Sequence, residues 1–335
     1  MRVAVTGASG LIGTALVRRL EAEGHQVLRL TRSRPTGPDQ AYWDPAAGQL
    51  DPEVLAKADA VVHLAAKNIG DQLRWTARTK REILQTRVEG TGLVARTMAG
   101  LAGGPGSPGP GEPGAGEPGA GEPGPGSPGA SASGGPRVLV CASGVGFYGD
   151  RGDEVLTEAS SGGRGFLADV VRRWEAAADP AREAGLRVVH LRTGPVQTAA
   201  GAGLPKQALL FRMGLGGRFG SGRQWLSWVS LDDIAGAYLH ALTSGDLQGP
   251  VNVVAPNPVT NAEFTATLAR VLHRPAVVHV PAFAPRLALG EFADEMLLVS
   301  QRARPARLQE TGYRFQFPEL EPALRHTLGR GSGES

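Results

Sequence analysis

The chain has 335 residues, of which 41% are hydrophobic and 20% are charged, and its formal net charge is +3. This length suits one large α/β unit with an appended region, and the apolar fraction is enough to bury a core. Lys and Arg are scattered among acids, which argues against a nucleic-acid-binding surface. No apolar run approaches the roughly 20 residues that span a bilayer, so we expect no membrane partner.

Cys141 is the single cysteine, and it lies inside an apolar run at 138–142. A lone thiol cannot form an internal disulfide, so we expect a buried side chain and a reducing compartment. The chain opens directly on a strand pattern, without a charged leader and a long apolar stretch behind it. These features predict a cytoplasmic protein.

Strand and helix patterns alternate in the first half of the chain. Predicted strands lie at 2–6, 26–31, 60–64, 137–142 and 187–191, and predicted helices at 11–23, 72–101 and 165–184. Repeated β-α-β units with short connections imply a parallel sheet with right-handed crossovers. We therefore predict an α/β fold, with a doubly wound parallel sheet of the Rossmann type over residues 1–195.

Residues 103–136 interrupt this pattern, because they are almost wholly Gly, Pro, Ser, Ala and Glu. Glycine recurs there at alternating spacings of two and three, which excludes a collagen triple helix. The segment lacks the apolar residues that would offset the entropy lost on ordering. We predict a disordered surface insert.

The periodicity loosens after Leu191. Helices are predicted at 232–243, 261–272 and 319–328, and a strand at 251–254. We predict that residues 196–330 form a smaller C-terminal region, which binds substrate and is largely helical. Its stretch at 201–222 is Gly-rich. The charges of Arg212, Arg218 and Arg223 could contact an anionic group, so we expect a small-molecule, anionic substrate; the oligomeric state is left open.

The turn at 6–13 reads Thr-Gly-Ala-Ser-Gly-Leu-Ile-Gly, and it joins the first predicted strand to the first predicted helix. Gly7 permits the tight turn, Gly10 lets the backbone approach a pyrophosphate, and Gly13 allows close packing of helix on strand. Amide groups at the helix N-terminus would hold the diphosphate. The predicted dinucleotide-binding residues here are Gly7, Ser9, Gly10, Leu11, Ile12 and Gly13.

The end of the second predicted strand indicates which dinucleotide is bound. It reads Thr31-Arg32-Ser33-Arg34, and no acid follows before Asp39. An acid there would bond the ribose 2′-hydroxyl, whereas a guanidinium can pair with a 2′-phosphate through two charged hydrogen bonds. We therefore predict NADP, with Arg32 at the phosphate and Ser33 assisting. The alternative is that these are ordinary solvated loop arginines.

Longer motifs accompany the glycine turn: His63-Leu64-Ala65-Ala66, Arg87-xx-Gly90-Thr91, Ala-Ser-Gly-Val-Gly-Phe-Tyr-Gly at 142–149 and Trp-Val-Ser-Leu-Asp-Asp at 228–233. Together they resemble the extended short-chain dehydrogenase/reductases, which are NAD(P)-dependent and similar to epimerases and dehydratases. Arg74-Trp75, Trp174-Glu175 and the segment 287–294 resemble the atypical "epimerase family protein" subgroup, whose members carry a C-terminal domain of unknown function. The resemblance covers the chain outside residues 103–136.

The resemblance implies roles for further residues. Leu64, Ala65 and Ala66 would line the adenosine and ribose side, and Thr86 would lie near the cofactor. Ser143 would end its strand beside the nicotinamide, and Pro195 would approach the carboxamide. His63 is interpreted as a buried imidazole whose nitrogens are satisfied.

The catalytic pair of the wider family is missing. That pair is a Tyr made acidic by a Lys four residues later, which moves a proton as hydride moves. Alignment on Glu175 puts Leu167 at the Tyr position and Val171 at the Lys position, and neither side chain can transfer a proton. Ser143 and Tyr148 remain as catalytic candidates; alternatively, Tyr148 only packs. The histidines are dispersed, so we expect no metal site.

Three hypotheses of function follow. The first is an NADP(H)-binding oxidoreductase or epimerase with a non-standard proton donor and an unknown substrate. The second is a catalytically inactive NADP(H)-binding regulator, since members of the subgroup are sometimes labelled cell-division inhibitors. The third is a structural homologue with neither activity.

Overall fold

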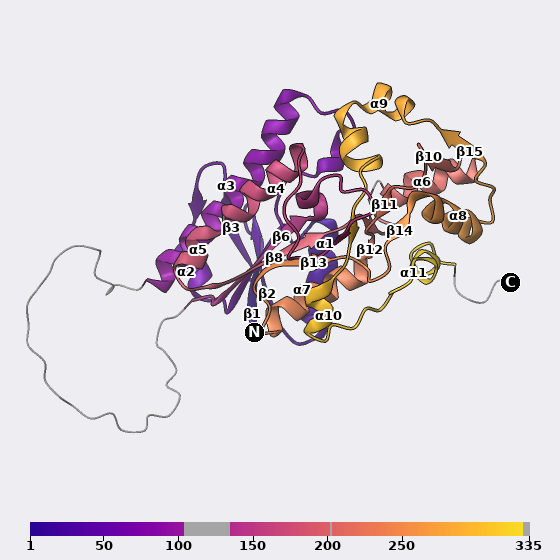
Figure 1. Cartoon of the computed structure of the whole chain (residues 1–335). Helices are drawn as coiled ribbons and strands as arrows, with labels where there is room; N and C mark the ends of the chain where they lie inside the picture. Colours follow the sequence, from indigo (N-terminus) through magenta and orange to yellow (C-terminus); the bar gives the residue numbers. More distant parts are fainter. Residues whose placement is uncertain (104–134, 202, 331–335) are drawn as a thin grey trace, which may run out of the picture.

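A single eight-stranded sheet forms the centre of the protein. The computed structural model describes residues 1–103, 135–201 and 203–330, so residues 104–134 of the predicted disordered insert lie outside the described residues. The strand order is β13-β8-β6-β5-β1-β2-β3-β4, and every neighbouring pair is parallel except β3 with β4 (Figure 1). The predicted doubly wound Rossmann-type sheet is confirmed.

The five strands predicted in the first half of the chain all form, and two short ones were not anticipated. The strands of the sheet are β1 (Arg2–Thr6), β2 (Gln26–Thr31), β3 (Gln40–Asp44), β4 (Gln49–Leu50), β5 (Ala60–His63), β6 (Val138–Gly144), β8 (Arg187–Thr193) and β13 (Gly249–Val253). The segments β1, β5 and β6 are largely apolar runs because helices cover both faces of a parallel sheet.

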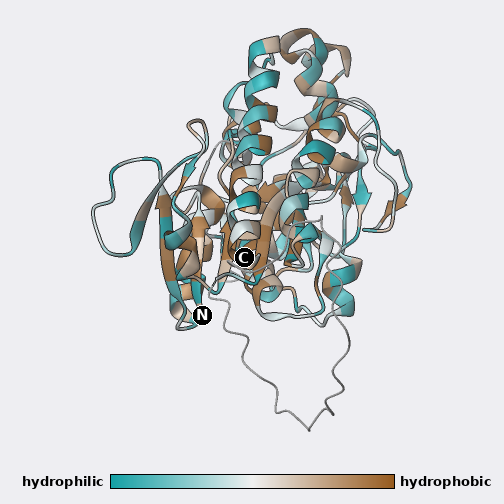
Figure 2. Cartoon of the chain, turned by 90° about the vertical axis from the view of Figure 1, so that its left-hand side faces the viewer, coloured by the Kyte–Doolittle hydropathy of each residue, from teal (hydrophilic) through white to brown (hydrophobic). Residues whose placement is uncertain are grey.

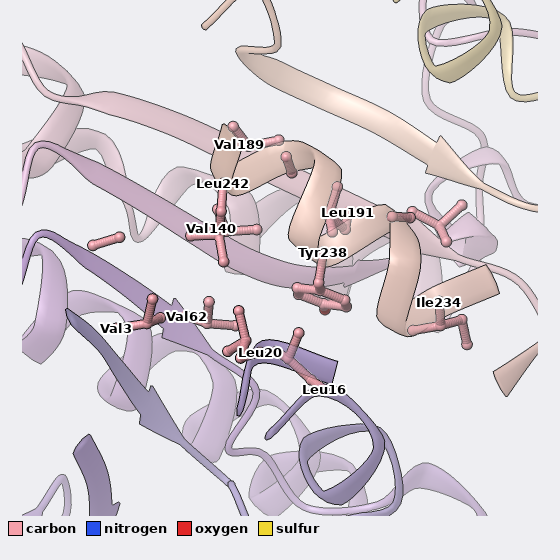
Figure 3. Close-up of a cluster of buried hydrophobic side chains, with 14 of the residues drawn as sticks. Val3, Leu16, Leu20, Val62, Val140, Val189, Leu191, Ile234, Tyr238 and Leu242 are labelled. Carbon is pink, nitrogen blue, oxygen red and sulfur yellow. The ribbon is translucent and has the colours of Figure 1, made fainter. Parts of the chain in front are cut away.

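Helices α1 (Leu11–Ala22) and α7 (Leu231–Thr243) cover one face of the sheet. Their side chains pack with alternate residues of the strands, and Figure 3 shows Leu16, Leu20 and Tyr238 meeting Val62 and Val140 there. The other face is covered by α2 (Pro52–Ala56), α3 (Ala77–Ala102), α4 (Phe166–Ala176) and α5 (Asp179–Glu183). Figure 2 shows the apolar strands at the centre and polar helix faces outside.

Three local features differ from the sequence prediction. The helix expected at 165–184 is two helices, because Pro180 lies in the first turn of α5 and removes a backbone donor there. Residues 40–56 form β3, β4 and α2, where a buried Trp43 fixes β3. The Gly-rich stretch at 201–222, where no helix was predicted, contains α6 (Gly203–Arg212), which buries Leu204, Ala208 and Phe211 at helical spacing.

The C-terminal region has a hydrophobic core of its own. That core joins α6, α8 (Asn261–Leu272) and α11 (Leu320–Thr327), with Phe264 and Leu268 at its centre. The region also holds α9 (Phe283–Leu289), a π-helical turn at Ala293–Leu297, and α10 (Ala306–Glu310). The chain does not divide cleanly at residue 195, because α7 and β13 return to the main sheet.

Residues 291–295 hold the C-terminal region against the start of α3 and α4. The Lys80 ammonium lies 2.8 and 2.9 Å from the two carboxylate oxygens of Glu291. The Glu295 carboxylate accepts the backbone amides of Phe166 at 2.8 Å and Leu167 at 3.2 Å, so it caps α4. Within 1–103, 135–201 and 203–330, every helix is too short or too polar to cross a membrane.

Candidate functional site

The candidate site is a cavity of about 1080 Å³ at the carboxyl ends of β5, β1 and β2. The chain passes from β1 to β2 on one side and later to β5 on the other, so the strand order reverses at β1. Ligands of open α/β sheets bind outside the strand ends at such a switch point. The cavity therefore lies where the fold predicts a dinucleotide.

The glycine turn has the geometry that the sequence predicted. Gly7 has φ +68°, and a Cβ there would lie 2.9 Å from the Ala65 nitrogen. A Cβ on Gly13 would lie 2.1 Å from the Gly7 oxygen, so only glycine lets α1 pack this close to the turn. Gly10 precedes α1, whose first turn has neither a side-chain cap nor an acid. The helix N-terminus thus offers its amides and its partial positive charge to an anion.

Thr6 connects the end of β1 with the loop that follows β5. Its hydroxyl oxygen accepts the backbone amides of Leu64 at 3.1 Å and Ala65 at 3.2 Å, and it lies 2.8 Å from Nδ1 of His63. Because the hydroxyl already accepts two amides, its proton can go to His63, which assigns the proton of the neutral ring to Nε2. Thr6 is a site residue that the sequence analysis missed.

His63 is fully buried, and burial lowers its pKa to about 4. The expectation of a satisfied imidazole holds for only one nitrogen, since Nε2 has no hydrogen-bond partner among the residues described. The ring packs edge-on against Trp43, and a Cβ on Gly90 would lie 3.2 Å from its Cε1. Gly90 therefore lets α3 approach this strand end.

Helix α3 fixes the loop after β5 from the other side. The hydroxyl of Thr86 accepts the backbone amide of Lys67 at 3.2 Å, and Nη1 of Arg87 donates to the Lys67 carbonyl at 2.9 Å. Thr86 also lines the cavity. The wall formed by Leu64, Ala65 and Ala66 is therefore held at both ends before any ligand binds.

The end of β2 gives the cavity a basic rim. Arg32, Ser33 and Arg34 line it and are exposed, and neither arginine forms an ion pair within the described part of the chain. The Thr31 hydroxyl accepts the Ser33 amide at 3.2 Å and lies 2.8 Å from its hydroxyl, which shapes the turn. Asp39, the first acid after β2, is already paired with Arg29.

The structure brings most of the predicted cofactor residues together. Nine line the cavity: Gly7, Ser9, Gly10, Arg32, Ser33, Leu64, Ala65, Ala66 and Thr86. Four do not line it. Gly13 is buried behind the turn, Ile12 packs on the core, Leu11 is 37% exposed, and Pro195 follows β8.

Ser143 is held by a buried ion pair. It follows Cys141, which pairs with His63, so it lies at the strand end next to the Leu64–Ala66 wall. Its hydroxyl donates to Oε1 of Glu175 at 2.6 Å, and Glu175 takes two further hydrogen bonds, of 2.8 and 2.7 Å, from Arg192. Burial alone would raise the pKa of Glu175, but Arg192 and Ser143 outweigh it and hold the pKa below its usual value.

Tyr148 does not reach the cavity. Its side chain is fully buried, and its hydroxyl donates toward the Asn252 side-chain oxygen at 2.8 Å and the Thr157 carbonyl at 3.0 Å, while Arg192 donates to it at 3.2 Å. Burial also raises its pKa. This geometry contradicts the reading of Tyr148 as a proton donor and favours the packing alternative, in which the residue supports Arg192.

The predicted substrate arginines lie in the C-terminal region and outside the cavity. Arg212 ends α6, Arg218 lies on the short strand β10 (Gly217–Phe219), and Arg223 follows in the next turn. All three side chains are exposed. Cys141 is buried, as expected.

Comparison with known proteins decides the family. The NAD dependent epimerase/dehydratase family matches residues 3–254, and a domain of unknown function, DUF1731, matches residues 280–327. The chain belongs to the NAD-dependent epimerase/dehydratase family. Within that family it is 39% identical over 328 residues to an epimerase family protein of Mycobacterium bovis, with 98% of each chain covered. It is 35% identical to the human epimerase family protein SDR39U1, covering 98% of this chain and all of the relative.

Solved structures of this family share the fold. The human protein SDR39U1, crystallised with NADPH, superposes with a TM-score of 0.79 at 33% identity, covering 98% of this chain and 99% of that one. A nucleoside-diphosphate sugar epimerase from Corynebacterium glutamicum gives 0.74 at 34% identity, covering 98% of this chain and 58% of that one. The epimerase/dehydratase family and the C-terminal domain of unknown function are both as the sequence motifs indicated.

The two residues that the sequence analysis aligned with the family's Tyr–Lys pair are packing residues in this structure. Leu167 and Val171 are each 5% exposed, and a Cβ added to Gly146 would lie 3.1 Å from Cβ of Leu167. The start of α4 therefore packs against the turn that follows β6. Its cap is the carboxylate of Glu295, from the C-terminal domain.

Proposed function

We propose that this chain binds NADP(H) in the switch-point cavity and acts as an oxidoreductase or epimerase on a small anionic substrate. The observation that carries the proposal is the cavity itself, which joins a glycine turn, an uncapped helix N-terminus and the guanidinium of Arg32, which has no ion pair within the described part of the chain. The NADPH in the structure of the human relative supports the same cofactor choice.

The residues fit this cofactor in detail. Gly7 and Gly13 leave no room for a side chain where the turn meets Ala65 and α1, so the diphosphate would meet backbone amides alone. Arg32 would pair with the 2′-phosphate through two hydrogen bonds, and Ser33 would add a hydroxyl. Leu64, Ala65 and Ala66 would cover the adenosine and ribose.

The reaction requires a proton as well as a hydride. NADPH, when bound, supplies a hydride to an electrophilic carbon. Ser143 would orient the substrate oxygen, and Glu175 and Arg192 would fix its hydroxyl. Glu175 stays ionised, so it holds Ser143 rather than donating a proton. We propose that the proton comes from a group of the substrate region or from water. The lone buried cysteine fits a cytoplasmic location.

The second candidate is an NADP(H)-binding regulator without turnover. Specific observations favour it: Leu167 and Val171 pack where the catalytic pair would be, and Tyr148 is buried. A regulator would keep the cofactor cavity and the contacts with the C-terminal domain, and would need no proton donor.

Turnover distinguishes the two candidates. Purified protein would be incubated with NADPH and a panel of carbonyl compounds and sugar nucleotides, and NADPH oxidation and epimer formation would be followed. The enzyme is supported if turnover is found and Ser143→Ala reduces it about tenfold or more. Ser161→Ala is the matched surface control. Tight NADPH binding without turnover across the panel contradicts the enzyme and supports the regulator.

A further inference from the structure

A second cavity lies on the opposite side of the sheet from α7, at the edge strand. Its volume is about 660 Å³, within the usual range for small-ligand sites. Residues of α4, α5 and β8 line one part of it, and Gly249 and Pro250 of β13 and Arg307 of α10 line the rest. None of its lining residues belongs to the cofactor cavity.

Positive charge dominates the polar part of this cavity. Arg182, Arg192 and Arg307 line it, against the two carboxylates Glu175 and Asp179. Both carboxylates are already engaged: Glu175 holds Arg192 and Ser143, and Asp179 lies 3.1 Å from Arg182. The charges within the two ion pairs cancel, so the wall carries a net charge of +1, and Arg307 is the lining arginine that has no carboxylate partner among the described residues.

The guanidinium of Arg307 is held in a position where it could bind an anion. Its Nη1 donates to the carbonyl oxygens of Gln248 and Pro250, which fixes the guanidinium at the cavity wall. Its Nε and Nη2 donate to no other group among the described residues, and no carboxylate there forms a salt bridge with it. Glu158 accepts the Arg307 backbone amide at 3.2 Å, and burial raises the pKa of Glu158.

The remaining wall suits a short carbon skeleton. Leu186, Val188 and Pro250 give it an apolar side. His190 adds a ring that is 9% exposed, whose Nδ1 has no hydrogen-bond partner among the described residues. Burial lowers the pKa of His190, so the ring is neutral and adds no competing charge.

We infer that this edge cavity is a binding site for a small organic anion, which carries a carboxylate or a phosphate group. Arg307 and Arg182 would hold the charged group, and the apolar wall would hold its skeleton. Because Glu175 and Arg192 form part of the same wall, the bound anion would lie beside the ion pair that orients Ser143. The site does not depend on the proposed redox function.

Calorimetry on the full chain tests the site. The protein is first saturated with NADPH, so that added anions cannot bind in the cofactor cavity, and is then titrated with inorganic phosphate or, separately, with succinate. We expect saturable binding of at least one of the two, and the tighter one identifies the preferred group. Arg307→Lys keeps the charge but loses the planar fork, so it should weaken binding about tenfold or more.

Two further variants keep the test independent of folding defects. Arg182→Gln removes an exposed charge from α5 and should weaken binding about threefold or more. Arg173→Gln, an equally exposed arginine on α4 outside the cavity, should bind as the unaltered protein does. The inference is overturned if neither anion binds the NADPH-saturated protein, or if Arg182→Gln and a folded Arg307→Lys bind with unchanged affinity.

Discussion

The hydroxyl of Ser143 donates a 2.6 Å hydrogen bond to Glu175, whose carboxylate is also held by Arg192. The Arg192 side chain is only 4% exposed, so this ion pair is shielded from solvent and its geometry is fixed. The Glu175–Arg192 pair therefore orients the Ser143 hydroxyl at the end of β6, beside the wall formed by Leu64, Ala65 and Ala66.

Replacing Glu175 tests that ion pair. Glu175→Gln leaves the buried Arg192 without a counter-charge and should lower the free energy of unfolding by about 3 kcal/mol at pH 7. Asp169→Asn, a half-exposed acid on the same helix that pairs with Arg172 and Arg173 at the surface, should change it by less than about 1 kcal/mol. Urea unfolding measures both; equal small losses would show that the pair is not stabilising.

The same variant has a defined pH dependence. The pKa of Glu175 is lowered in the folded state, so its contribution to stability is present above the unfolded pKa of about 4.3. That contribution is lost as the pH falls through the folded pKa. The stability difference between the unaltered protein and Glu175→Gln should therefore shrink in acid, and a difference that grew with acidity would contradict the assignment.

His63 predicts a second pH effect at higher pH. Its folded pKa is about 4 and its unfolded value about 6.5, so the unfolded chain binds a proton first as the pH falls. Stability should decline between these values, by about 2 kcal/mol from pH 7.5 to pH 5. Over the same pH interval, the free energy of unfolding of His63→Asn should fall by about 2 kcal/mol less than that of the unaltered protein. Denaturant unfolding of both proteins at the two pH values measures this difference. The same pH dependence of stability in the variant and the unaltered protein would refute the prediction.

Gly13 tests the close contact of helix and turn. A Cβ there would lie 2.1 Å from the Gly7 carbonyl oxygen, so Gly13→Ala must displace the cofactor loop. We expect NADPH affinity to fall about tenfold or more, and stability to fall by about 2 kcal/mol. Gly100→Ala is the control, since it lies on α3 with no atom near its added Cβ, and it should be neutral or slightly stabilising. Similar behaviour of the two variants would exclude a steric role for Gly13.

Arg32 tests the cofactor preference. Arg32→Ala should weaken NADPH binding about tenfold or more through loss of charged hydrogen bonds, and should change NADH binding by less than about threefold. Arg81→Ala, an exposed arginine on α3 outside the cavity, should leave both affinities unchanged. Fluorescence titration with each nucleotide provides the measurement. Equal losses for NADPH and NADH would show that Arg32 does not contact the 2′-phosphate.

Strong local patterns made the sheet and the glycine turn predictable from the sequence. Apolar runs such as 60–64 require burial on both faces, and Gly7 with Gly13 fits one backbone geometry. The segments β3 and β4 gave weaker signals, since they lie at the sheet edge and each buries a single side chain, Trp43 in β3 and Leu50 in β4. Helix α6 does carry helical spacing, but the glycines around it obscured the pattern.

Long-range side-chain partners limited the prediction of the site. Thr6 is an ordinary strand residue in sequence, and its role appears only when β5 lies beside β1 and its hydroxyl meets two amides. The partnership of Ser143 with Glu175 and Arg192 spans three separate elements, so no local pattern encodes it. The choice between a catalytic and a packing Tyr148 stayed open for the same reason, because its hydroxyl bonds to Asn252, more than a hundred residues away.

Calorimetric titration of the intact chain with NADPH, and with NADH for comparison, tests the central claim most directly. We predict one NADPH bound per chain, with NADH bound about tenfold more weakly or worse, because only NADPH carries the phosphate that Arg32 can hold. Absence of saturable NADPH binding by the folded protein would contradict the account, whatever substrate is later found.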